Sequence, residues 1–107
     1  MLNLADLFGK LQELQQRVAT LEAELERKTT SVEVGGGLVQ ITASASGRIV
    51  RIQIEPSALN LEEREVLEDL LVAGVNKALE EARRLAQEEM SRITAGLLPP
   101  GFRLPGW

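Results

Sequence analysis

The chain lacks the three side chains that most often act as general acids, bases or nucleophiles, because its 107 residues include no histidine, cysteine or tyrosine. Catalysis would therefore depend on carboxylates, lysines and hydroxyl groups. The adjacent pairs Glu62-Glu63 and Glu88-Glu89 point about 100° apart on a helix, so neither pair converges on one substrate. A calcium- or magnesium-type site needs carboxylates grouped on a loop, and the sequence has no such group. We therefore expect no catalytic residue, metal, cofactor or small-molecule substrate.

Three consecutive glycines, residues 35–37, are a candidate phosphate-binding loop. A phosphate loop leads from a strand into a helix and normally carries a lysine followed by serine or threonine. Here the glycines lead into Leu38-Val39, which has the character of a strand. Because glycine tolerates the positive φ angles of a tight turn, the run favours a β-hairpin.

Lysine and arginine remain as groups that could bind a negatively charged partner. The chain carries twelve of them against sixteen acidic residues, a formal net charge of −4. The surplus negative charge lies in residues 57–69, where five acidic side chains accompany Arg64 alone. The distribution of charge, more than its sum, decides what approaches a surface. The composition therefore permits a nucleic-acid partner, although no continuous basic stripe is visible.

Residues 1–28 carry an apolar seam in which leucine or valine recurs at alternating spacings of three and four. The seam consists of Leu4, Leu7, Leu11, Leu14, Val18, Leu21 and Leu25. This period predicts one amphipathic helix from about Asn3 to Arg27, with Asn3 as its cap. Lys28 falls on the next seam position, so the seam ends there.

Residues 29–56 change to a period of two. Apolar and polar residues alternate in three runs, which are separated by the glycines 35–37 and by Ser46-Gly47 and closed by Pro56. Such runs predict a three-stranded antiparallel sheet with one apolar and one polar face.

Residues 57–96 return to helical spacing. Asn60 followed by Glu63 is a capping-box pattern, and apolar residues recur to about Ala95, where we expect Gly96 to end the helix. At about 1.5 Å per residue this helix would be on the order of 50 Å long. Both helices should therefore be longer than a small three-stranded sheet, and part of each should project beyond the sheet as an arm.

Small residues in the second helix predict close contacts. The first helix could lay its leucines in the narrow groove made by Ala78, Ala82 and Ala86. Gly74 costs about 1 kcal/mol relative to alanine in a helix, so we expect two helices to cross closely there.

These elements make a single α+β domain of order α-β-β-β-α, followed by a Pro- and Gly-rich tail, residues 97–107. The first helix ends at the sheet and the second begins there, so we expect their far ends to be the arms and the acidic segment 57–69 to lie at the sheet. The arm cations are Lys10, Arg17, Arg83, Arg84 and Arg92. No apolar run approaches the ~20 residues of a membrane span, and we expect a cytoplasmic protein that contacts no membrane.

Several stretches resemble the YbaB/EbfC family of nucleoid-associated proteins. In the sheet they are Gly36-Gly37-Leu38-Val39-Gln40-Ile41-Thr42 and the segment from Gly47 to Pro56. The segment from Leu67 to Ala78, the ending from Gly96 to Phe102 and Lys10-Leu11-Gln12 extend the resemblance over nearly the whole chain in the same order.

The resemblance implies a homodimer whose helical arms spread from a central sheet and hold double-stranded DNA with little sequence preference, organising the nucleoid and affecting transcription. On this basis the DNA-contacting residues are predicted to be Lys10, Arg17, Arg83, Arg84 and Arg92. An alternative remains open: a dimeric scaffold whose arms clasp a partner protein. Electrostatic DNA binding falls with salt, whereas capture of a protein by the leucine seam would be insensitive to salt.

Overall fold

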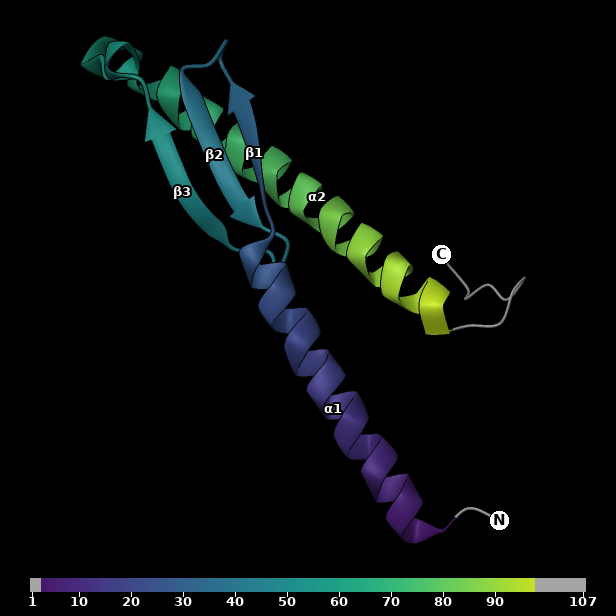
Figure 1. The fold of residues 1–107 in the computed structure, drawn as a ribbon. Coiled ribbons are helices and arrows are strands. Elements are labelled where there is room, and N and C mark those ends of the chain that lie inside the picture. The colour runs from purple at the N-terminus through teal and green to yellow at the C-terminus, as the bar shows by residue number, and fades with distance from the viewer. Residues whose placement is uncertain (1–2, 98–107) are drawn as a thin grey trace.

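The structure is a computed structural model that describes residues 3–97, with side chains to residue 93. Its elements are α1 (Leu4–Arg27), β1 (Thr29–Val34), β2 (Val39–Ser44), β3 (Ile49–Ile54), two short 3-10 helices (Pro56–Ala58 and Leu61–Glu63) and α2 (Arg64–Leu97). The predicted α-β-β-β-α order and α+β class are confirmed. The molecule is elongated, 72 × 28 × 16 Å, because α1 extends away from the sheet and α2 (Figure 1).

Helix α1 has the ends that its sequence predicts. The Asn3 side chain accepts a hydrogen bond from the backbone N–H of Ala5 at 2.7 Å, and Asp6 lies in the first turn, where a negative charge suits the helix dipole. At the other end the Lys28 backbone N–H donates to the Glu24 carbonyl, and the chain turns into β1. No residue of α1 is buried.

The sheet is an antiparallel meander of order β1-β2-β3. In its register Val32 lies opposite Ile41, and Ile41 lies opposite Ile52, so these three side chains share one face. The glycines 35–37 connect β1 to β2 with φ angles of 66°, 67° and 93°, which confirms the predicted hairpin turn. In β3 the pairing shifts by one residue at Val50, which forms a bulge.

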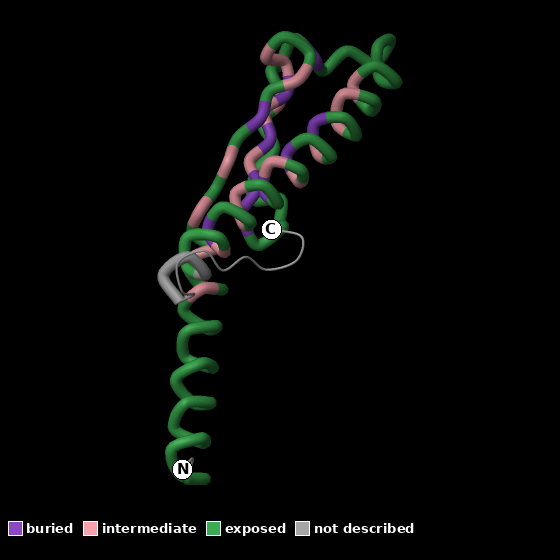
Figure 2. Tube along the Cα trace, turned by 90° about the vertical axis from the view of Figure 1, so that its right-hand side faces the viewer, coloured by how far each residue is buried: buried purple, intermediate pink, exposed green. Residues whose placement is uncertain are grey.

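Helix α2 covers the apolar face of β1 and β2 (Figure 2). The buried cluster between them consists of Val32, Val39, Ile41, Ala43, Ala78 and Ala82. Two predictions therefore named the wrong contact for α2. Ala78 and Ala82 pack against strand side chains and not against the leucines of α1. Gly74 permits close approach of the sheet and not of a helix. A Cβ on Gly74 would lie 2.6 Å from Ile41 Cδ1.

The ends of α2 differ slightly from the sequence prediction. Asn60 caps the 3-10 turn that leads into α2, where its side chain accepts from the Glu62 backbone N–H at 3.1 Å. The helix continues through Gly96 to Leu97, so Gly96 does not end it. The predicted tail from residue 98 onward lies outside the described residues. Within residues 3–97 no helix has the length and hydropathy needed to cross a membrane.

Candidate nucleic-acid interface

Lys10 and Arg17 lie on the projecting part of α1, as predicted. Both are exposed, and neither forms an ion pair with any residue in the described part of the chain. A spacing of seven residues is two helical turns, so the two side chains leave α1 on the same side, about 10 Å apart along its axis. They form a short cationic edge on a solvent-exposed rod.

Arg83 and Arg84 are not at the end of an arm, which corrects the predicted placement. They follow Ala82, which is fully buried against the strands, so this part of α2 lies on the sheet. The physical reason is that small residues let α2 pack along the strands as far as the root of α1, instead of leaving the sheet after a few turns.

The two neighbouring arginines differ in their partners. Arg84 is held by Glu81, at 3.1 Å from its Nε, and by Glu88. The hydrogen bond to Glu81 and the charge of Glu88 raise the pKa of Arg84 above its usual value. Arg83 is exposed and forms no ion pair within the described residues, so it remains available for an anionic ligand.

Arg92 belongs to a cluster at the junction of the two helices. Glu89, whose side chain is 6% exposed, pairs with Lys28 at the end of α1 and with Arg92 at 3.3 Å. The hydrogen bond from Lys28 lowers the pKa of Glu89 below its usual value, against the opposing effect of desolvation. We call Lys28, Glu89 and Arg92 the junction cluster. It connects α2 to the root of the arm, and Arg92 itself stays largely exposed.

The junction cluster was not predicted, although the sequence pattern contained a signal for it. Lys28 occupies the next seam position, directly after α1, and Glu89 occupies the buried side of α2, seven residues after Ala82. Each is a charged residue in an apolar phase, and the two have opposite signs. A buried charge requires a partner, so these two were candidates to meet.

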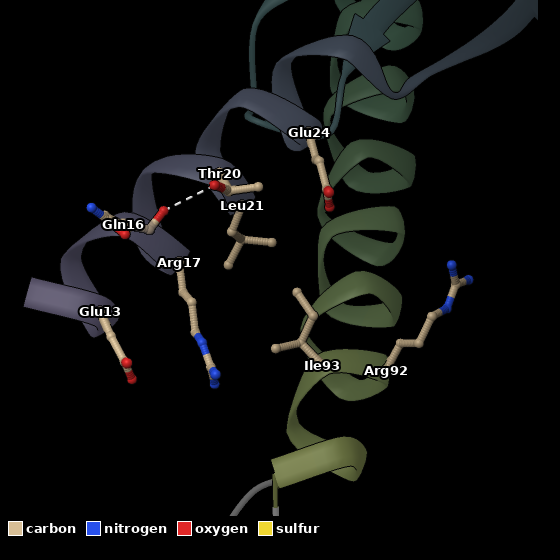
Figure 3. Close-up of a pocket in the computed structure, with 8 residues that line it drawn as sticks. All are labelled: Glu13, Gln16, Arg17, Thr20, Leu21, Glu24, Arg92 and Ile93. Atoms are coloured by element: carbon tan, nitrogen blue, oxygen red, sulfur yellow. Dashed lines mark hydrogen bonds between the residues drawn. The ribbon is translucent and has the colours of Figure 1, made fainter. Parts of the chain in front are cut away.

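A groove of about 680 Å³ separates the middle of α1 from the end of α2. Leu21 and Ile93 point into it from the two helices, whereas Arg92 extends from the side of α2 away from α1 (Figure 3). Arg17 and Arg92 both line the groove, one from each helix, but their side chains extend in different directions (Figure 3).

The acidic segment lies at the opposite end of the body from the arm, as predicted. A side chain on Gly35, in the β1–β2 turn, would touch Leu70, so the start of α2 lies at that end of the sheet, while α1 leaves from the other end (Figure 1). Three further cations, which were not among the predicted contacts, are exposed and form no ion pair in the described part of the chain: Arg27, Arg51 and Lys77. Among the described residues no acidic cluster could hold a metal ion.

Residues 1–97 match the YbaB/EbfC DNA-binding family. A nucleoid-associated protein of Methylocella silvestris is 36% identical over 106 residues, which cover 98% of this chain and 99% of the relative. A nucleoid-associated protein of Bartonella bacilliformis is 38% identical over 104 residues, 96% of each chain. The crystal structure of an uncharacterized Helicobacter pylori protein, 22% identical, superposes with a TM-score of 0.66 over 92% of this chain and all of that chain, which shows a shared fold.

Proposed function

The chain belongs to the YbaB/EbfC DNA-binding family, and we propose that it is a nucleoid-associated protein that binds double-stranded DNA as a homodimer. In this proposal lysine and arginine side chains contact the phosphates, with little preference for base sequence. The protein works in the cytoplasm at the nucleoid, which it organises, and thereby it affects transcription. It performs no catalysis.

The observation that carries this proposal is the free cationic edge of α1. Asp6 and Glu13 lie one turn from Lys10, yet neither forms an ion pair with it or with Arg17. Each phosphate neutralised by such a cation releases condensed counterions, which supplies most of the free energy of non-specific binding. Because the surplus acidic residues lie at the far end of the body, the arm can approach DNA with little repulsion.

All five predicted cations are part of the proposed interface. The ion pairs in the structure suggest how their contributions to DNA affinity should rank. Lys10, Arg17 and Arg83 are exposed and form no ion pair within residues 3–93, so they can bind phosphate directly. Arg84 and Arg92 must first exchange a glutamate for a phosphate. We therefore expect Lys10, Arg17 and Arg83 to contribute more to affinity than the other two.

The proposed homodimer is supported by the apolar side chains of β3. Helix α2 packs mainly on β1 and β2. Ile52 lies opposite the buried Ile41 and yet is 44% exposed, and Val50 at the bulge is 59% exposed. The outer edge of β3 also has no neighbouring strand in the described part of the chain. An unprotected apolar edge strand of this kind favours pairing with another chain, here a second copy.

The test is duplex binding by the purified protein over a series of salt concentrations. Electrostatic binding predicts that the logarithm of the association constant falls linearly with the logarithm of salt, with a slope near −0.9 for each phosphate neutralised. Affinities that are independent of salt, or the absence of duplex binding at low salt, would contradict the proposal. Ile52→Glu should convert the dimer to monomer at micromolar concentration, and an unchanged mass would reject β3 as the dimer contact.

A second candidate, a scaffold whose arms clasp a partner protein, is favoured by one observation: the leucine seam of α1 is exposed. The same salt series separates the two functions, because apolar capture of a protein persists at salt concentrations that release DNA.

A further inference from the structure

The first four turns of α1 present an uncovered apolar stripe. We call it the tip seam, and it consists of Leu4, Leu7, Leu11, Leu14 and Val18. Leu4 is 72% exposed and Leu14 is 55% exposed, and the other three are close to half exposed. Apolar surface gains about 25 cal/mol per Å² when it leaves water, and a contiguous exposed patch of this kind marks an interaction site.

No other element in the described part of the chain covers the tip seam. Ile93, near the end of α2, lies across the groove from Leu21, which is beyond the tip seam toward the sheet. Figure 1 shows α1 continuing well past the described end of α2. The β3 side chains that we assign to the homodimer contact lie in the body, apart from the tip seam.

The chemistry of the seam fits a second copy of this chain. Residues 4–18 carry two acidic and two basic side chains, so two such helices can approach each other without net repulsion. Its heptad spacing is the pattern by which two α-helices interlock, and leucine occupies its d positions, Leu7 and Leu14. An identical helix matches this pattern layer by layer.

We propose that the tip seam pairs with the tip seam of a second copy as a short parallel two-stranded coiled coil. Charge selects the parallel arrangement. In a parallel pair, position g of one helix faces position e of the other helix five residues later. Arg17 then faces the partner's Glu22, and Lys10 faces the partner's Gln15. In the antiparallel registers that keep most of the seam, Arg17 faces the partner's Lys10 or the partner's Arg17, and like charges repel.

The consequence is that one chain has two separate contacts with other copies, at β3 and at the arm. Dimers formed through β3 are then joined through their arms. Helical pairing over about two heptads is weak in isolation. On DNA, however, neighbouring dimers are held at a high effective concentration, so arm pairing makes binding along the duplex cooperative.

The first test measures self-association without DNA, so that its outcome is independent of DNA binding. Sedimentation of the full-length protein is compared with that of Leu11→Glu/Leu14→Glu. The matched control, Gln12→Glu/Gln16→Glu, adds the same charges to the outer side of α1. Glutamate is a good helix former and α1 has no buried residue, so all three proteins should fold, which far-UV circular dichroism verifies.

The seam variant should lose the species larger than a dimer, with at least a tenfold weaker association constant, while the control behaves as wild type. Identical sedimentation of wild type and seam variant over the whole concentration range would overturn the proposal. A seam variant that becomes monomeric would also overturn it, because the seam would then be the primary dimer contact and not a second one.

The second test uses the absence of cysteine from the chain. Parallel pairing places residue 7 of both helices in the same layer, so Leu7→Cys should form an intermolecular disulfide under mild oxidation. Gln12→Cys, on the outer side of the helix, is the control and should remain reduced. Failure of Leu7→Cys to cross-link in a protein that still associates would overturn parallel pairing.

Discussion

The two helices have comparable apolar patterns and very different surroundings. In α2 the residues buried deepest against the sheet are small, Gly74, Ala78 and Ala82, and larger residues, Leu67, Leu70, Leu71 and Val75, pack partly buried beside them. In α1 the corresponding stripe is made of leucines, and none of its residues is buried. Small side chains allow a helix backbone to lie close to a sheet, whereas long branched ones keep neighbours at the distance of a helical partner. The size of the residues in an apolar stripe, together with their spacing, therefore helps to distinguish a helix that packs on its own chain from a helix whose apolar stripe stays exposed.

The largest expected effect follows from the two glycines inside these helices. A Cβ on Gly74 would lie 2.6 Å from Ile41 Cδ1 and 3.1 Å from Val34 Cγ2, whereas nothing lies within 4 Å of a Cβ on Gly9. Gly74→Val should therefore lower the free energy of unfolding by about 3 kcal/mol through overpacking. Gly9→Val is the matched control and should change stability little. Urea denaturation measures both variants. Equal midpoints would contradict the conclusion that Gly74 is packed against the sheet and that Gly9 has no neighbours.

The next largest effect concerns DNA. Lys10→Gln/Arg17→Gln removes two phosphate contacts from each arm. For each arm that contacts the duplex, this should weaken binding on the order of 50-fold at 0.1 M salt and reduce the salt slope by about 1.8. Arg64→Gln removes a positive charge at the acidic end of the body and should leave the salt slope unchanged. Fluorescence anisotropy with a labelled duplex gives both quantities. Equal losses in the two proteins would mean that the arm is not the principal contact.

A smaller effect is expected at the junction cluster, where arm and body meet. The Lys28 hydrogen bond lowers the pKa of Glu89 in the folded protein below its ordinary value of 4.5. A carboxyl group with a lowered pKa stabilises the fold above its ordinary pKa, and this contribution is lost as pH falls through the folded value. Wild-type stability should therefore decrease more steeply than that of Glu89→Gln as the pH falls from neutral to about 3.

Urea denaturation at successive pH values measures that difference. Glu88→Gln is its control, because Glu88 is an exposed acid next in sequence that pairs with Arg84 instead of Lys28. If Glu88→Gln and Glu89→Gln change the pH dependence equally, the junction cluster has no special role in joining the arm to the body.

The period of the apolar residues was enough to predict the elements and the fold class. Asn3 and Lys28 mark the ends of α1, and the glycines 35–37 form the hairpin that their backbone freedom permits. What the period could not supply was the partner of each apolar face. Ala82 is in a helical phase whether a strand or a helix covers it, so Arg83 was assigned to an arm although it lies beside the sheet.

The candidate DNA-binding residues were also predictable only in part, because the spacing of residues shows which side chains are exposed but not which partners they contact. Exposure of Lys10 and Arg17 follows from their place on the polar side of a long seam. The ion pairs that hold Arg84 and Arg92 depend on which rotamers neighbouring glutamates adopt, and the Lys28–Glu89 contact joins residues 61 positions apart. Long-range contacts of this kind are set by how α2 lies on the sheet.

The smallest expected effect isolates the arm from the body. Gly9→Ala removes a helix-unfavourable glycine at a position without steric neighbours, so it should stabilise α1 locally by up to about 1 kcal/mol. Hydrogen exchange of amides in the first turns of α1 should slow accordingly, because fraying there is a local opening. The unfolding midpoint of the sheet and α2 should stay constant, since α1 contacts them only near its C-terminal end. A rise in that midpoint would show that arm and body unfold as one unit. The two helices would then differ in how exposed they are, but α1 would not unfold separately from the body.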